Sequence, residues 1–399
     1  MFDKLLSSEV QQFIKKNADA DVTTLLLKNN TVNGVAMRDL VEQIISRKKA
    51  KTKTPFLFHQ KGVIFPPKLS MEQCSSEHTA LYKSKIVEGK KGADLTGGAG
   101  IDAYFLGKKF ERFNYVEQNE SLANSVTHNF KTLGVTNTTT HVCTAEEFLS
   151  DATTDYDFIF IDPSRRDLDK NRVFLFSDCS PNIILLKKKL LEKAKTIMVK
   201  ASPWVDIKQG IDEIGNVEAI HVVAVENECK ELLFILSSKA VSSPKMICSN
   251  YKGVAGWKRF EYHLVEEEES ESVFSLPQNY LYEPNASIMK AGGFKVIGKK
   301  FGVTKLHPNS HLYTSEKIVN NFPGRIFKIT KALKYDSKSL LKSIPDKKAN
   351  ITCRNFPESV QQIRKKTKIK EGGDVYVFAT TTIDNKKTIL LTEKVVSHD

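Results

Sequence analysis

The feature that most constrains the fold is an alternation of short apolar strands with helices from residue 92 to about residue 238. Seven segments predict strands, at 93–96, 113–117, 139–143, 158–162, 196–200, 219–225 and 232–237. Helices are expected between them, at 103–109, 122–133, 146–149, 181–194 and 206–214. Apolar strands that alternate with helices indicate a parallel sheet covered on both faces. The expected fold class is therefore α/β, with a doubly wound, Rossmann-like sheet of seven strands.

The last two of these strands are joined by only about six residues, 226–231. A crossover between parallel strands needs a dozen or more residues. The final pair is therefore expected to be an antiparallel hairpin.

A glycine-rich turn follows the first predicted strand and opens a helix. Glycines at such a turn let a ligand approach the backbone closely, because no Cβ intervenes. The spacing Gly98-x-Gly100-x-x-Ala103 also matches a dinucleotide-binding pattern, so the turn alone does not identify its ligand. The candidate ligand-binding residues of the turn are Asp94, Thr96, Gly97, Gly98, Gly100 and Asp102.

The surroundings of the turn favour S-adenosyl-L-methionine over NAD. Asp94 and Asp102 disfavour a diphosphate and attract a sulfonium and an ammonium group. Glu117, at the end of the second strand, suits the two ribose hydroxyls of either cofactor. A terminal antiparallel hairpin is usual in methyltransferase sheets and unusual in dehydrogenases. Each acid alone reads also as a helix cap or a surface charge, but all three fall at strand ends, where open α/β sheets bind ligands.

The end of the third strand has two interpretations. Polar groups at this point commonly reach the adenine amine, which makes Thr144 and the backbone of Ala145 candidates for cofactor binding. Thr144 equally suits the N-cap of a helix, with Glu147 completing a capping box.

The fourth strand ends in a second candidate site. In a doubly wound sheet this strand neighbours the first, so its end is expected to face the transferred methyl group. Asp162 is expected to orient the nucleophile or to hold the substrate, and Pro163 to fix the local backbone. Arg165 and Arg166 offer planar donors for a phosphate or a guanine edge. The alternative is a strand-ending turn whose arginines pair with nearby aspartates.

The net charge of +13 is distributed unevenly along the 399 residues. Residues 285–399 hold 23 Lys and Arg against 9 Asp and Glu, a net charge of +14, and the remainder has a net charge of −1. A basic part beside a neutral one favours a nucleic acid as partner. The alternative is a solvated lysine-rich surface.

Composition argues against several other classes. No run approaches the roughly 18 apolar residues of a membrane span, and the N-terminus resembles a polar amphipathic helix rather than a signal peptide. Six cysteines without a C-x-x-C pair argue against a disulfide framework and a zinc site. We therefore expect no membrane, no metal and a cytoplasmic location.

The remaining segments suggest four parts. Helices are expected up to about residue 53, then a small hairpin at 56–58 and 63–65 with Gly62 in its turn. Residues 239–276 are expected to extend the sheet, with an exposed acidic loop at 266–269. The predicted domains are an N-terminal helical segment at 1–70, the α/β domain at 71–276, and two basic α+β modules at 277–324 and 325–399.

The motifs DLTGGAG (94–100) and IDPSRR (161–166), together with Glu117, resemble the class I S-adenosylmethionine-dependent methyltransferases. EQCSSEHTALYKSK (72–85), NECKELLFIL (227–236) and ITCRNFPES (351–359) extend the likeness over nearly the whole chain. They resemble a bacterial family, common in Bacteroidetes, of class I methyltransferases with a C-terminal THUMP-like domain. The resemblance implies a ferredoxin-like module at 277–324, a THUMP-like domain at 325–399, and Gln73, Ser76 and Lys83 at the methionine end of the cofactor.

THUMP domains bind RNA in tRNA-modifying enzymes, so the resemblance favours an RNA methyltransferase acting on tRNA or rRNA. Many nucleic-acid methyltransferases hold an exocyclic amine with an Asp/Asn-Pro-Pro-aromatic motif. Here Ser164 and Arg165 replace the second proline and the aromatic residue, which disfavours an exocyclic amine and leaves a ring nitrogen or another atom. The alternatives are a small-molecule or protein methyltransferase and a non-enzymatic RNA-binding protein.

Overall fold

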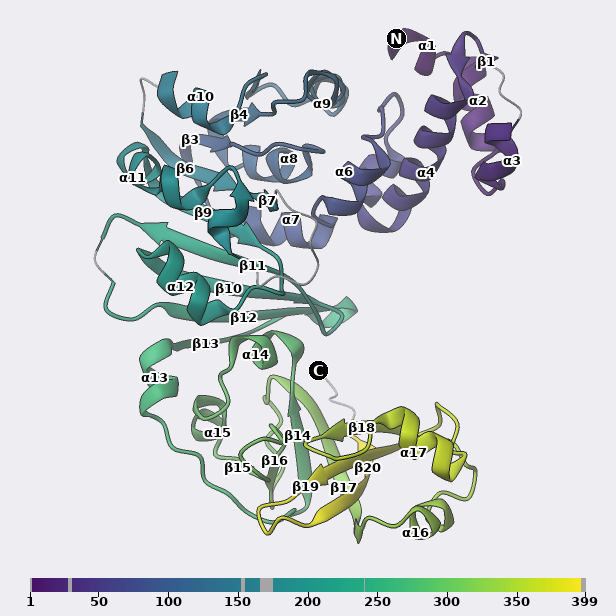
Figure 1. Ribbon diagram of the computed structural model, residues 1–399, viewed down its shortest axis with the longest axis vertical. Helices are drawn as coiled ribbons and strands as arrows, with labels where there is room; N and C mark the ends of the chain where they lie inside the picture. Colours follow the sequence, from purple (N-terminus) through teal and green to yellow (C-terminus); the bar gives the residue numbers. More distant parts are fainter. Residues whose placement is uncertain (1, 28–30, 152–154, 166–174, 240, 396–399) are drawn as a thin grey trace. The chain divides into compact units, whose positions relative to one another are not determined.

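The computed structural model describes residues 2–27, 31–151, 155–165, 175–239 and 241–395 (Figure 1). The chain divides into two compact units. The first consists of Met1–Ala219 with Lys230–Ser242, and the second of Ile220–Cys229 with Ser243–Asp399.

The first unit contains the expected parallel sheet. Its strands are β3 (Gly89–Asp94), β4 (Phe110–Val116), β5 (Thr138–His141), β6 (Tyr156–Ile161) and β9 (Ala194–Ala201). They lie side by side in the order β5-β4-β3-β6-β9, and each is parallel to its neighbours (Figure 1). The strand order reverses between β3 and β6, so a ligand is expected at the carboxyl ends of these strands.

Helices alternate with these strands as the sequence predicts: α8 (Ile101–Gly107), α9 (Glu120–Thr132), α10 (Ala145–Asp151), α11 (Ile183–Lys193) and α12 (Ile207–Ile214). Local chemistry sets where they begin. The side chain of Asn119 accepts a hydrogen bond from the Leu122 N–H at 2.9 Å and caps α9. The apolar run of β6 is fully buried from Phe158 to Ile161, as a strand covered on both faces requires.

The predicted terminal hairpin is confirmed. β10 (Val217–Val225) and β11 (Glu228–Ser237) are neighbours, and Glu226 and Asn227 between them have φ values of 50° and 61°. Such positive φ values are those of a two-residue hairpin turn. β11 also pairs antiparallel with β9, with Leu232 opposite Ala201.

β12 (Lys245–Lys252) and β13 (Gly256–His263) complete a nine-stranded sheet in the order β13-β12-β10-β11-β9-β6-β3-β4-β5. The sheet extension predicted for residues 239–276 is thus present. The acidic run is not a loop, because residues 266–269 belong to helix α13 (Leu264–Glu269). Glu266 accepts a hydrogen bond from the His263 N–H at 2.7 Å and so stabilises the start of this helix.

The N-terminal segment is helical, with α1 (Phe2–Leu5), α2 (Ser8–Lys16), α3 (Val22–Leu27), the short strands β1 (Thr31–Val32) and β2 (Val35–Ala36), α4 (Met37–Lys53), α5 (Pro55–His59), α6 (Lys68–Gln73) and α7 (Glu77–Ser84). The hairpin predicted for 56–65 is wrong. Pro55 begins α5 instead, where its missing N–H costs nothing. Ile64 has a side chain as its partner, since its N–H and C=O bond the Asn129 amide at 2.8 and 2.7 Å.

The second unit contains a seven-stranded sheet in the order β15-β16-β14-β17-β20-β19-β18. Its strands are β14 (Tyr280–Pro284), β15 (Thr304–Lys305), β16 (Tyr313–Ser315), β17 (Gly324–Lys334), β18 (Asn350–Arg354), β19 (Val375–Thr381) and β20 (Lys387–Lys394). Its helices are α14 (Ala286–Ala291), α15 (Val296–Phe301), α16 (Ser337–Lys342) and α17 (Val360–Thr367). β17 pairs with both β14 and β20, so the two predicted C-terminal modules share one sheet.

Two further observations concern only the described residues. None of their helices is long and apolar enough to cross a membrane. They contain no group of three or more His, Cys, Asp or Glu side chains that could hold a metal ion.

Candidate active site

A cavity of about 1230 Å³ opens at the carboxyl ends of β3, β4, β6 and β9. It lies within the first unit, at the predicted ligand-binding edge of the sheet. Eleven residues singled out from the sequence line it: Gln73, Asp94, Thr96, Gly97, Gly98, Asp102, Glu117, Thr144, Ala145, Asp162 and Pro163.

The glycines of the turn have different structural roles. A Cβ on Gly97 would lie 2.1 Å from the ring of Tyr115, and one on Gly100, where φ is 72°, would lie 2.4 Å from Val126. These two glycines therefore allow the turn to pack on β4 and α9. A Cβ on Gly98 would meet no atom within 3.6 Å, so its backbone is open to a ligand. Gly100 itself does not line the cavity.

Glu117 fixes the turn and still presents its carboxylate to the cavity. One of its oxygens accepts a hydrogen bond from the Gly98 N–H at 2.9 Å, and the other accepts one from the Asn119 N–H at 2.8 Å. Each carboxylate oxygen has further lone-pair sites for a ligand. The half-buried Glu117 is thus held in place to accept hydrogen bonds from a pair of hydroxyl groups.

Asp94 is buried in the wall of the cavity. Its Oδ1 accepts a hydrogen bond from the Thr96 N–H at 3.0 Å, whereas its Oδ2 has no hydrogen-bond partner among the described residues. Burial raises the pKa of Asp94 well above its ordinary value. An unpartnered carboxyl oxygen at a cavity wall suits a cationic ligand, whose charge would stabilise the ionised form.

The raised pKa predicts that Asp94 lowers the stability of the folded protein in a pH-dependent way. A group whose pKa is higher in the folded than in the unfolded state loses stability as the pH rises through the folded pKa. We therefore expect Asp94→Asn to be more stable than the wild type at pH 8, and the difference to vanish below about pH 4, where both forms are neutral. Urea unfolding of both proteins from about pH 3 to pH 8 tests this, and equal stability throughout that range would contradict it.

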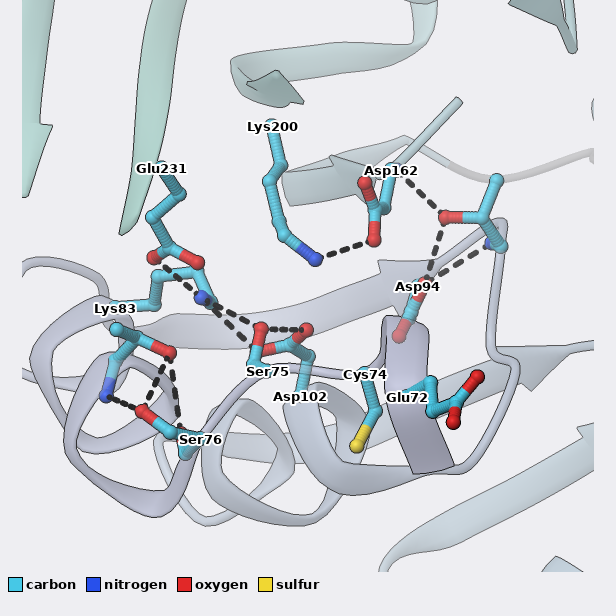
Figure 2. A network of polar contacts seen from close by, with 12 residues as sticks. Glu72, Cys74, Ser75, Ser76, Lys83, Asp94, Asp102, Asp162, Lys200 and Glu231 are labelled. Carbon is cyan, nitrogen blue, oxygen red and sulfur yellow. Dashed lines mark hydrogen bonds and ion pairs between the residues drawn. The ribbon is translucent and has the colours of Figure 1, made fainter. Parts of the chain in front are cut away.

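Asp102 differs from Asp94, because its charge is already paired. Lys83 Nζ lies 3.2 Å from its carboxylate, and the Ser75 hydroxyl donates to it at 2.7 Å. Burial would raise the pKa of Asp102, but the charges of Lys83 and Lys200 bring it below its ordinary value. Figure 2 shows the Lys83 ammonium between Asp102 and Glu231, and it contacts the Glu231 carboxylate at 2.6 Å. Asp102 thus anchors a buried lysine instead of standing free for a ligand.

The three residues that the resemblance implied at the methionine end lie in different places. Gln73 ends α6 and lines the cavity. Ser76 caps α7 by accepting a hydrogen bond from the Thr79 N–H at 3.3 Å, and Lys83 has no exposed side-chain surface. Ser76 and Lys83 are both described, and neither lines the cavity.

The structure confirms the capping interpretation of Thr144, while the contact with adenine stays a prediction. Its N–H donates to the Glu147 carboxylate at 2.8 Å, and the Glu147 N–H donates to its Oγ1 at 3.2 Å. This reciprocal pair is a capping box at the start of α10. The N–H, hydroxyl and carbonyl of Thr144 all have partners, so a ligand contact at this wall is expected mainly from the backbone of Ala145.

The end of β6 forms the opposite wall. The Asp162 N–H donates to Thr96 Oγ1 at 2.7 Å, which joins this wall to the glycine-rich turn. Pro163 lines the cavity, and Ser164–Arg165 then form β7, which pairs antiparallel with β8 (Cys179–Ser180). Only the backbone of Arg165 is described, and Arg166 lies outside the described residues.

Three residues that the sequence analysis did not select belong to this region. Lys200, the penultimate residue of β9, contacts the Asp162 carboxylate at 2.5 Å (Figure 2). Glu231 precedes the apolar part of β11 and binds Lys83, and Trp204 lines the cavity with 88% of its surface exposed. Their positions in the sequence could have indicated Lys200 and Glu231, because both are charged residues within otherwise apolar strand segments beside the predicted site.

The thiols at this cavity are poor nucleophiles. Cys74 and Cys143 both line it. Burial raises the pKa of Cys74 to about 11 and also raises the pKa of Cys143. Both thiols are therefore mostly protonated near neutral pH, and the arrangement favours direct attack by a substrate atom over a cysteine intermediate.

Comparisons with known proteins agree with the fold. A family model described as a ferredoxin-like domain matches residues 280–323. A second model, described as THUMP domain-like, matches residues 324–394. No curated protein gives a significant match. A solved structure, described as a "putative methyltransferase from Porphyromonas gingivalis W83", is 32% identical, covers 97% of this chain and 98% of its own, and has a TM-score of 0.86.

More distant structures match only part of the chain. A "putative methyltransferase" of Escherichia coli is 16% identical, covers 41% of this chain and 86% of its own, and has a TM-score of 0.30. An "rRNA methylase" of Streptococcus thermophilus is 14% identical, covers 41% and 95%, and has a TM-score of 0.29. The likeness to the Porphyromonas protein extends over the whole of both chains, and it shows that this chain belongs to the bacterial family of class I methyltransferases with a C-terminal THUMP-like domain.

Proposed function

We propose that the protein is an S-adenosylmethionine-dependent RNA methyltransferase. The observation that carries the proposal is the cavity at the switch point of the sheet. There Glu117 offers two fixed carboxylate oxygens, and Asp94 offers an unpartnered buried one. Glu117 would bind the ribose hydroxyls, the Gly98 backbone would lie against the ligand, and Asp94 would face its positive charge. When bound, this cofactor supplies a methyl group attached to a sulfonium, and the thioether that remains after transfer is a good leaving group.

The remaining work of the protein is positioning. Holding the acceptor atom in line with the methyl group accounts for much of the rate enhancement in such a transfer. The wall formed by Asp162, Pro163 and Lys200 faces the same cavity as the glycine-rich turn. We therefore assign the acceptor to this wall.

The case for RNA rests on the C-terminal part of the chain. It combines the net charge of +14 in residues 285–399 with the THUMP domain-like match at 324–394. Exposed lysines follow one another at the end of α17 and beyond it, at Lys365, Lys368 and Lys370. Arg364 has a structural role instead, because its guanidinium donates to the carbonyls of Ile369 and Ala349.

Trp204 adds a feature suited to a nucleobase. The residue is 88% exposed and belongs to the cavity lining. Single-stranded RNA is commonly held by stacking of its bases on such aromatic rings. We therefore assign Trp204 to the substrate and not to the cofactor.

Binding to bulk tRNA should be strongly salt-dependent, because lysines that neutralise phosphates release counterions. Lys365→Glu with Lys370→Glu should weaken binding and reduce the slope of log K against log salt by roughly 0.7 to 0.9 for each phosphate that is no longer neutralised. The matched control is Lys90→Glu with Lys131→Glu, two exposed lysines of the first unit. Filter binding at several salt concentrations measures the slopes, and salt-independent binding would contradict the proposal.

The test of function is transfer of a labelled methyl group from S-adenosylmethionine by the full chain. Total RNA from a strain without the gene is the probe, with a protein extract and a small-molecule extract of the same strain beside it. We expect label in RNA. Label only in protein or in small molecules would support a protein or small-molecule methyltransferase. Cofactor-independent RNA binding without any transfer would support a non-enzymatic RNA-binding protein.

A further inference from the structure

Lys200 and Asp162 form a charged pair at the acceptor wall of the cavity. Asp162 directly follows β6, Lys200 is the penultimate residue of its parallel neighbour β9, and the Lys200 ammonium lies 2.5 Å from Asp162 Oδ2. Their side chains are 11% and 34% exposed, and both residues line the cavity. Lys200 is therefore mostly buried and Asp162 partly exposed, and both lie within reach of a substrate in the cavity.

The surroundings keep this lysine charged. Burial alone would lower the pKa of Lys200, but the carboxylates of Asp162, Asp102 and Glu231 raise it above its ordinary value. Figure 2 shows a second buried lysine, Lys83, that shares the charges of Glu231 and Asp102, and Asp162 is the carboxylate that Lys200 contacts directly. Lys200 thus offers N–H donors to a substrate, and it does not act as a base.

An exocyclic amine and a ring nitrogen without a proton both fit such a pair poorly as acceptors of the methyl group. An exocyclic amine presents N–H donors, since its lone pair is delocalised into the ring, and so has nothing to accept a hydrogen bond from an ammonium. A ring nitrogen that accepts from Lys200 would have its only lone pair occupied, and that lone pair must attack the methyl group. A ring nitrogen that carries a proton beside a carbonyl, such as guanine N1, can meet both groups, but only through two different atoms, so the Lys200 ammonium would not contact the atom that is methylated.

A hydroxyl group fits the pair. It has one proton to donate and two lone pairs to accept with. One lone pair can bind the Lys200 ammonium while the other faces the methyl group, and the proton can point at Asp162. Lys200 takes up Oδ2, which leaves Oδ1 of Asp162 for that proton.

We propose that Lys200 and Asp162 hold the 2′-hydroxyl of a ribose in RNA and that the protein methylates this oxygen. The inference rests on the proposed function and adds the target atom. Of the groups in unmodified RNA, the 2′-hydroxyl is the alcohol present in every internal nucleotide and absent from DNA.

The step balances without a further reagent. The hydroxyl oxygen forms a bond to the methyl carbon as the carbon–sulfur bond breaks, and the sulfonium becomes a neutral thioether. The hydroxyl proton passes to the Asp162 carboxylate and from there to water. The Lys200 ammonium stabilises the negative charge that develops on the oxygen.

The target atom can be read from the wild-type protein. Total RNA from a strain without the gene is labelled with methyl-tritiated S-adenosylmethionine and then hydrolysed in alkali. A 2′-O-methyl group blocks cleavage of the adjacent phosphodiester, so we expect the label in alkali-stable dinucleotides. Label in mononucleotides would place the methyl group on a base and overturn this inference while leaving the proposed function intact. Absence of label from all RNA would contradict the proposed function, and this inference with it.

Variants test the role of the pair. We expect Lys200→Met to lower the rate of transfer by about 100-fold or more and to change the affinity for S-adenosylmethionine less than about threefold. Lys195→Met is the matched control, because Lys195 forms the same kind of pair with Asp157, at 2.7 Å, between the same two strands and away from the cavity. It should keep its transfer rate within about twofold. Equal losses in the two variants, or an unchanged rate in Lys200→Met, would overturn the role of Lys200. If Lys200→Met does not fold, Asp162→Asn replaces it with the same expectation, and the alkaline hydrolysis remains decisive.

Discussion

Replacing Lys83 by methionine is expected to lower the free energy of unfolding of the first unit by about 3 to 5 kcal/mol. The ammonium has no exposed surface and lies 2.6 Å from Glu231, 3.0 Å from Ser75 and 3.2 Å from Asp102. Methionine has a similar length but no charge, so it would leave two buried carboxylates without their cation. Urea unfolding of the full chain, followed by a probe in the first unit, measures the loss.

The residue that follows this helix supplies the control for the prediction. Lys85 follows α7, is exposed, and is expected to tolerate methionine within about 0.5 kcal/mol. Combining Lys83→Met with Glu231→Gln should restore part of the lost stability, since one of the two uncompensated carboxylates is then gone. A Lys83→Met protein as stable as the wild type would show that the contacts of Lys83 with Glu231, Ser75 and Asp102 do not hold α7 to the sheet.

The second large effect is expected at Glu117. Glu117→Ala removes a charged acceptor of hydrogen bonds, and such bonds contribute about 1.5 to 3 kcal/mol. The affinity for S-adenosylmethionine should therefore fall by roughly 10- to 100-fold. The substitution also frees the Gly98 N–H, which Glu117 holds at 2.9 Å, so the turn loses part of its preorganisation.

Glu120→Ala is the control for this variant. Glu120 is an exposed acid at the start of α9, three residues further along the chain. It should bind the cofactor as the wild type does. Equal binding by the Glu117→Ala protein would remove Glu117 from the site and leave Asp94 and the turn as its remaining support.

The strand ends were the part of the site that the sequence could predict. Asp94, Glu117 and Asp162 each follow or end an apolar run, and parallel strands bring their carboxyl ends to one edge. The alternation of strands and helices predicted the sheet, and the short link at 226–231 predicted its antiparallel end. These features follow from local pattern and chain connectivity.

Interactions between distant segments were not predictable in the same way. Lys83 and Glu231 are 148 positions apart, and nothing local indicates that one neutralises the other. The failure at 56–65 has the same origin, because the partner of Ile64 is the side chain of Asn129, 65 residues away. A run of apolar residues beside a glycine resembles a hairpin until such a partner is known.

The flanking acids of the turn illustrate both cases. The sequence treats Asp94 and Asp102 alike, as two anions beside a glycine-rich turn. Among the described residues, Asp94 Oδ2 and Asp102 Oδ1 both lack a hydrogen-bond partner, but Asp102 Oδ1 lies 3.2 Å from the Lys83 ammonium and Asp102 Oδ2 accepts from Ser75. We therefore now assign the expected attraction for a cation mainly to Asp94, and this assignment stays a prediction.

The most direct test of the central claim is a calorimetric titration of the full chain with S-adenosylmethionine and, separately, with NAD. We predict one saturable site for S-adenosylmethionine, weakened by Glu117→Ala and unchanged by Glu120→Ala, and no binding of NAD. Binding of NAD, or no binding of S-adenosylmethionine by a folded chain, would contradict the account.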